Sequence, residues 1–361
     1  MRHLGPIGRL GIGIPAAVLG MLLAVTPVLA CGGLIGPNGA VNLLRTTTMA
    51  GYHDGIEHYV TAFQFAGGGG AFGSITPLPG IPSSVEKGGD WTLQRLVRET
   101  SPIQLDSLER AAVPSAAGAQ EIMKVKIDAL DITVLRGGSK DIGAWAKNHG
   151  FRLPPDSPEV LDFYAERSPI FLAAAFDADA ANQRGQQIGD GTPVHITIPT
   201  ANPWVPLRIL ALGKTGQEHV DADVYLMTDR RPALLPKPTG DNGIRLDYSA
   251  WATASLLSDL RSDRGMDWVP SSAWLSKVVV DSSAAGLSYD LAIDASGANA
   301  PSRVAAGLAL PAVEDVLKTV QSVQSAASGV DVGRLLLAVM FSVVGIFGIF
   351  LIARYRPGET R

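Results

Sequence analysis

Hydrophobic and polar residues alternate along several short stretches of the chain. The period of two is clearest in residues 57–65, 124–136, 194–198 and 220–224. Successive side chains of a strand point to opposite faces of its sheet, so this alternation is typical of half-buried strands in antiparallel sheets. In the third stretch Val194, Ile196 and Ile198 would face the core, and we expect His195 to face water.

Helices are predicted between these strands. Signals for the ends of helices flank residues 91–99, 140–149 and 157–167, and residues 250–260 are a further candidate. Asp90 and Ser139 are candidate N-caps of the first two helices, and Pro158 stands in the first turn of the third. The second and third helices would form a hairpin joined by residues 151–156.

The remaining stretches are rich in glycine, proline and serine, and we expect them to be loops: residues 74–90, 111–120, 177–193 and 231–245. Strands with a few inserted helices predict an α+β fold with a largely antiparallel sheet. We assign this fold to residues 31–308, as one domain that is either undivided or built of two lobes.

A longer apolar run lies near the C-terminus. Residues 335–353 contain no charged side chain, and Ser342 is their only polar one. As a helix rising about 1.5 Å per residue, the run would span about 28 Å, close to the thickness of the hydrocarbon core. Arg354, Arg356 and Arg361 follow it, and positive residues stay on the cytoplasmic side. We predict a transmembrane helix over 335–353 and a cytoplasmic tail over 354–361.

The N-terminus carries a second membrane signal. Arg2 and Arg9 precede an apolar run over residues 10–30 that ends in small side chains, which is typical of a cleavable signal peptide over residues 1–30. An uncleaved anchor is the alternative. Cys31 would follow the cut, either as a lipid acceptor or as a free thiol. The domain at 31–308 would therefore lie outside the cytoplasm.

Residues 309–334 would connect that domain to the membrane. Apolar residues recur there at a spacing of three and four, which is typical of one face of a helix: Val313, Val316, Leu317, Val320 and Val323. Such a helix would either pack on the domain or form a stalk that associates with another helix.

Composition narrows the classes of function. Only 18% of residues are charged, 46% are hydrophobic and the net charge is −4, without a basic stripe. Nucleic acid is therefore not an expected partner, because phosphate binding requires clustered lysine and arginine. Cys31 is the only cysteine, which excludes an internal disulfide.

Candidate chemistry is confined to one short cluster. His53, Glu57 and His58 lie within six residues and are candidate metal ligands, although Glu57 and His58 would point to opposite faces of a strand. Gly68, Gly70 and Gly73 match a dinucleotide-binding spacing, but prolines follow where that site needs a helix. We predict no nucleotide, no cofactor and no catalytic set.

Several blocks of the chain together resemble an exported bacterial family known only as a domain of unknown function (DUF2330-like): Ala30-Cys31-Gly32-Gly33, residues 54–80, Gly89-Asp90-Trp91, residues 144–154, Trp204-Val205-Pro206-Leu207-Arg208 and residues 257–268. The resemblance implies an envelope location and one contiguous domain, and it supplies no activity. Relatives often carry a second cysteine after the first, which this chain lacks, so no disulfide carries over.

These observations predict a single-pass membrane protein that binds another envelope component, such as an envelope protein. The alternative is an extracytoplasmic enzyme of the hydrolase type that acts on a cell-envelope substrate through the cluster at residues 53–58.

Overall fold

The computed structural model describes residues 33–36, 39–40, 46–64, 72–101, 121–183 and 191–311. The predicted signal peptide, Cys31 and the predicted transmembrane helix lie outside these residues, as does all but the start of the connecting segment at 309–334. Within the described ranges, no helix combines the length and the apolar character that crossing a membrane requires.

Three sheets form the framework of the described residues. The six-stranded sheet runs in the order β2 (Gly39–Ala40), β1 (Gly33–Gly36), β5 (Phe72–Pro77), β9 (Ile170–Phe176), β8 (Leu130–Arg136), β7 (Glu121–Ile127). The seven-stranded sheet runs in the order β14 (Ile244–Trp251), β15 (Trp274–Ser283), β12 (His219–Thr228), β3 (Thr46–His53), β4 (Ile56–Gln64), β10 (Gly191–Pro199), β6 (Ser84–Lys87). A small third sheet holds β11 (Trp204–Val205), β16 (Leu291–Asp294), β13 (Ala233–Leu235).

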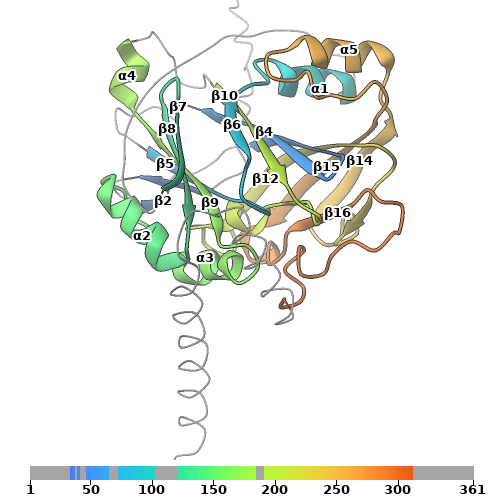
Figure 1. Ribbon diagram of the computed structural model, residues 1–361. Helices are drawn as coiled ribbons and strands as arrows, with labels where there is room; N and C mark the ends of the chain where they lie inside the picture. The colour runs from blue at the N-terminus through green and yellow to red at the C-terminus, as the bar shows by residue number, and fades with distance from the viewer. Residues whose placement is uncertain are drawn as a thin grey trace, which may run out of the picture.

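Neighbouring strands pair antiparallel except β3 and β12, which are parallel. The described α-helices are α1 (Thr92–Thr100), α2 (Ser139–Asn148), α3 (Ser157–Ala165), α4 (Ala178–Gln183) and α5 (Ala254–Ser262), and two short 3-10 helices cover Arg208–Ala211 and Ala284–Gly286. The α+β class with largely antiparallel sheets is therefore confirmed, together with the helical hairpin formed by α2 and α3 (Figure 1).

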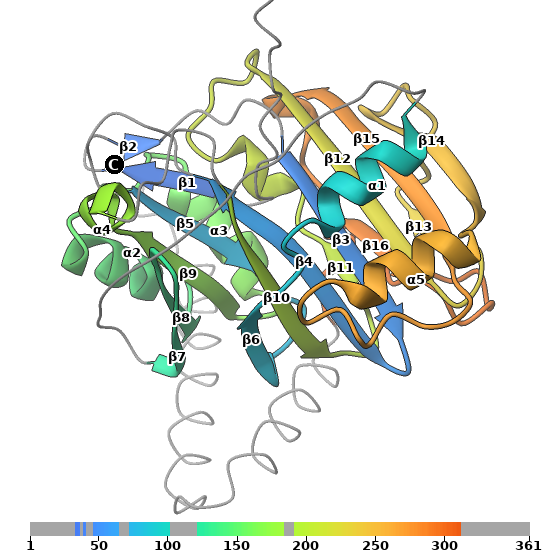
Figure 2. The same ribbon diagram turned by 90° about the horizontal axis from the view of Figure 1, so that it is seen from above.

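Both large sheets are covered on both faces. Leu172 and Ala174 of β9 face the core between the sheets, and the alternate residues Phe171 and Ala173 pack under α2 and α3. On the seven-stranded sheet α1 and α5 cover the outer face, where Leu93 and Leu257 join the core (Figure 2). Central strands such as β9 therefore bury successive side chains on opposite sides of the sheet.

The expected loops over residues 74–90, 177–193 and 231–245 all hold regular elements in their described parts. The second includes α4 and the start of β10, and the third includes β13 and the start of β14. Residues 74–90 were expected to form a loop, but they hold most of β5 and all of β6. The small residues of β5 fit between β1 and β9, so tertiary pairing overrides their low strand propensity. The helix expected over 250–260 starts later, because β14 continues to Trp251 and Thr253 caps α5 by accepting a hydrogen bond from the Leu256 amide.

The caps of α1 and α2 also differ from the prediction. Ser139 is the first residue of α2, and its amide and hydroxyl both donate to the carboxylate of Asp162 in α3, at 2.8 and 2.9 Å. Similarly Asp263, just after α5, accepts from the Trp91 amide at the start of α1 at 2.9 Å. In each helix pair, a carboxylate in or next to one helix therefore accepts hydrogen bonds from the N-terminal end of the other helix and joins the two.

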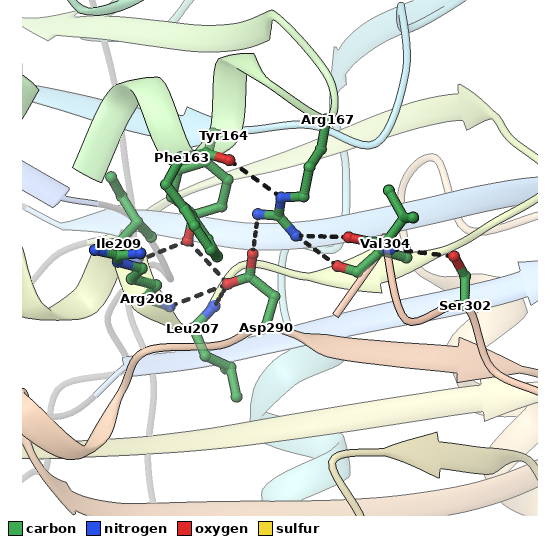
Figure 3. A network of polar contacts seen from close by, with 10 residues as sticks. Phe163, Tyr164, Arg167, Leu207, Arg208, Ile209, Asp290, Ser302 and Val304 are labelled. Carbon is green, nitrogen blue, oxygen red and sulfur yellow. Dashed lines mark hydrogen bonds and ion pairs between the residues drawn. The ribbon is translucent and has the colours of Figure 1, made fainter. Parts of the chain in front are cut away.

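A buried ion pair joins α3 to the third sheet (Figure 3). Asp290 lies immediately before β16, is fully buried, and contacts the Arg167 guanidinium at 2.6 Å. Its second oxygen accepts hydrogen bonds from the Tyr164 hydroxyl and from the amides of Leu207 and Arg208. Arg167 also donates to the carbonyl of Ala305 at 2.7 Å. The carboxylate thus joins three parts of the chain directly, and Arg167 connects a fourth.

We expect Asp290→Asn to destabilise the protein by about 3–5 kcal/mol, because it leaves the buried Arg167 guanidinium without its counter-charge. The measurement is urea unfolding of the purified chain, followed by tryptophan fluorescence. Glu159→Gln is the matched control, since Glu159 pairs with Arg208 at the surface with 76% of its side chain exposed. That change should cost at most about 1 kcal/mol. Equal losses in both variants would contradict the assignment.

Candidate functional site

Two histidines meet on the outer face of the seven-stranded sheet. The strand register pairs His58 of β4 with Thr197, and His195 of β10 with Val60, so the histidines are diagonal neighbours on one face. The Nδ1 atom of His58 lies 2.9 Å from the Nε2 atom of His195. A neutral imidazole offers one donor and one acceptor, so one ring donates to the other.

The side chain of Trp268 covers the two histidines. The indole of Trp268 stacks on His58 with ring centroids 3.8 Å apart and an interplanar angle of 3°. Gly51 of β3 lies opposite His58 in the sheet, and a Cβ atom there would come within 2.3 Å of the Trp268 ring. Only glycine leaves the space for this stack, and we call His58, His195 and Trp268 the histidine stack.

Burial keeps both histidines of the stack neutral. Desolvation, followed by the neighbouring His195 and His53, lowers the pKa of His58 from 6.5 to about 3. Desolvation also lowers the pKa of His195 to about 4, although Glu86, Asp267 and the Gly265 backbone act in the opposite direction. Only 8% of His58 and 6% of His195 is exposed.

Glu57 lies on the opposite face of the same strand. Its carboxyl is fully buried toward the third sheet, where one oxygen accepts a hydrogen bond from the Trp204 amide at 3.2 Å. Its other oxygen has no hydrogen-bond partner among the described residues. Desolvation raises the pKa of Glu57 to about 8, more than the Trp204 hydrogen bond lowers it. The carboxyl therefore carries a proton at neutral pH.

His53 lies apart from both groups, at the end of β3. Its ring is partly exposed, and the Nδ1 atom lies 2.7 Å from an Asp229 carboxylate oxygen. The Nε2 atom faces Asp54 at 3.3 Å. His53, Glu57 and His58 thus have three different environments, and they do not converge on one point. Among the described residues no three histidine, cysteine, aspartate or glutamate side chains form a group that could hold a metal ion.

The expectation that His195 faces water was wrong. The alternation in β10 does place Val194, Ile196 and Ile198 in the core between the sheets. However, the polar face of the strand is also covered, because the segment that carries Trp268 crosses it. The partner of His58 is therefore His195, which sequence spacing did not connect with it. Trp268 had no distinguishing signal among the six tryptophans.

Comparisons with known proteins identify a family and two distant structures. A family model described as "Uncharacterized protein conserved in bacteria (DUF2330)" matches residues 26–269. No curated protein matches the chain. The crystal structure of baculovirus P35 is 12% identical, with a TM-score of 0.38, and the match covers 70% of this chain and 96% of that one. A mutated baculovirus P35 after caspase cleavage is 11% identical, with a TM-score of 0.36 and coverages of 69% and 98%.

The opposite pKa shifts of Glu57 and the two histidines predict a maximum of stability near pH 6.5. Folding keeps a proton on Glu57 between its ordinary pKa of 4.5 and its folded value of about 8, so stability falls as pH rises through this range. Folding excludes protons from His58 and His195 below their ordinary value of 6.5, so their contribution is lost as pH falls below it.

We therefore expect the free energy of unfolding to fall by about 1 kcal/mol in total between pH 6.5 and 8, because the loss from Glu57 is partly offset by the two histidines. Glu57→Gln should abolish this decline, since an amide does not titrate, and urea unfolding at several pH values measures it. Glu159→Gln, at the surface, should leave the profile unchanged. A decline that persists in Glu57→Gln would assign the proton to another group.

Proposed function

This chain belongs to the DUF2330 family of bacterial proteins, and we propose that it is a membrane-anchored extracytoplasmic protein that binds another component of the cell envelope. Residues 1–30 act as the signal peptide and residues 335–353 as the single transmembrane helix. Residues 31–308 then lie outside the cytoplasm, residues 309–334 connect them to the membrane, and residues 354–361 form the cytoplasmic tail. The uncharged apolar run followed by arginines supports this topology.

The closure of the histidine stack supports binding rather than catalysis. A general acid or base must come within about 2.6–3.2 Å of the proton that it transfers. His58, His195 and Glu57 are the described histidines and carboxylate with large pKa shifts, yet all three are buried, so a substrate does not reach them in this structure. In contrast, the large hydrophobic side chain of Trp251 lies at the surface, where a partner can reach it.

We expect protease added to intact cells, with the outer layers opened, to digest residues 31–330. Alkaline carbonate should leave the full chain in the membrane fraction, because a spanning helix is held by its hydrophobic surface. A chain that ends at residue 334 is the matched control and should be released. If it remains bound, Cys31→Ser in the same truncated chain tests whether a lipid on Cys31 retains it. Release of the full chain by carbonate would contradict the proposed anchor.

The alternative function is an enzyme that acts on a cell-envelope substrate, and one contact favours it. The 2.7 Å contact between His53 and Asp229 is the arrangement in which a carboxylate orients an imidazole as a general base. Unlike the histidine stack, this pair is reached by solvent.

The proposed binding role predicts that the purified chain releases no soluble fragments from isolated cell walls. If the wild type releases fragments and His53→Gln slows this release by a factor of about 10²–10⁴, the result would favour the enzyme instead. Metal analysis of the same preparations, with a His53→Ala/His58→Ala double variant, tests a metal-dependent form of that enzyme.

A further inference from the structure

An aromatic side chain stands exposed at one margin of the seven-stranded sheet. β14 is the edge strand, beyond β15 (Figure 2). Its residues Leu246, Ser249 and Trp251 lie opposite Val278, Ser276 and Trp274 of β15. Alternate residues of β15 share one face, so the three β14 residues also share it. We call Leu246, Ser249 and Trp251, with Trp274 beside them, the β14 strip.

The strip presents a fixed aromatic surface to solvent. Trp251 is 54% exposed, and it is the only aromatic residue among the large hydrophobic side chains exposed in the described part of the chain. Its ring meets Trp274 edge to face, with centroids 5.3 Å apart and an angle of 72°. The Trp274 indole nitrogen donates to the Ser249 hydroxyl at 3.0 Å, which fixes the supporting ring.

Charged side chains around the strip are paired within the protein. Arg245 and Asp247 of β14 form an ion pair with each other. Lys277 of β15 contacts Asp223 at 3.3 Å and Asp247 at 3.4 Å. The fourth charged residue of these two strands is Asp281, which lies near the far end of β15 and contacts His219 at 3.6 Å. The strip therefore carries no cluster of positive charge for a nucleic acid or an anionic lipid headgroup.

The exposed apolar area is also too small for a stable protein interface. Such an interface buries about 800 Å² on each partner. A tryptophan buries about 150–250 Å² when fully covered, and about half of this one is exposed. Besides Trp251, the strip exposes part of Leu246 and smaller parts of Ser249 and Trp274, so its dimensions fit a small flat unit instead of a protein surface.

We propose that the β14 strip binds a neutral glycan chain of the cell envelope, with one sugar ring stacked on Trp251. The face of a pyranose ring carries C–H bonds with partial positive charge, and these are attracted to the negative face of an indole. Sugar hydroxyls can exchange hydrogen bonds with neighbouring polar groups such as Ser249. The strip extends about 13 Å from Leu246 to Trp251 at about 3.3 Å per residue of β15, the length of a short oligosaccharide.

This inference rests on the proposed extracytoplasmic location. The full chain, held in a polyoxyethylene detergent that contains no sugar, is sedimented with protein-free peptidoglycan sacculi. We expect the wild type to sediment, and a soluble tetramer of N-acetylglucosamine to release it. Trp251→Ala should bind about tenfold more weakly, and Trp251→Phe should bind with intermediate strength. Leu310→Ala removes a side chain that is 75% exposed elsewhere and should bind like the wild type.

A wild type that stays in solution, or a Trp251→Ala variant that sediments equally, would overturn the glycan assignment. A dimer in sedimentation velocity that Trp251→Ala dissociates would assign the strip to a second copy of the chain. If the urea midpoint shows that Trp251→Ala does not fold, the wild type alone tests the glycan assignment. Release of the wild type from the sacculi by the sugar tetramer would support the assignment, and no release would overturn it. The protease and carbonate experiments test the proposed location independently of the ligand. If the location is wrong, those two experiments give the contrary result. If only the glycan assignment is wrong, they still succeed and sacculus binding alone is lost.

Discussion

The carboxylate of Asp290 is withdrawn from water and receives hydrogen bonds from an arginine, a tyrosine and two backbone amides. A buried charge is tolerated only when its partners replace the hydration that it loses. Here those partners are Tyr164 of α3, Arg167 just after that helix, and the amides of Leu207 and Arg208 after β11. The position of β16 is therefore coupled to the helical hairpin on one sheet, and through β16 the third sheet is fixed over the core.

The third sheet and the pair α1 and α5 cover opposite faces of β4, and this determines the chemistry of its polar residues. Glu57 and His58 are sequence neighbours that must both be buried, on opposite sides. The fold leaves each in its neutral form: the carboxyl is protonated and the imidazole is paired with a second neutral imidazole. Neutralisation costs less than burying an isolated charge, so a strand can carry both polar residues without an ion pair.

The sequence predicted features that depend on local pattern. The alternation in β10 and β12, the α2–α3 hairpin and the α+β class follow from periodicity and helix-end residues. Features that depend on distant segments were not predictable. Asp162 and Asp263 cap helices remote from them in sequence, and Trp268 covers a strand face that alternation alone marks as wet. The anchor, the signal peptide and the role of Cys31 lie outside the described residues and stay predictions.

In the proposed glycan site, the ligand lies on the face of the edge strand β14. An open edge is prone to pair with strands of other chains, and charged residues and bulges oppose this pairing. β14 carries both devices, because the register shifts between Leu246 and Tyr248 and because Arg245 and Asp247 are charged. Trp251 lies past the bulge and points from the face of the sheet instead of its edge. A ligand that stacks on this face needs no backbone pairing, which is the property that a sugar ring has and an extended peptide lacks.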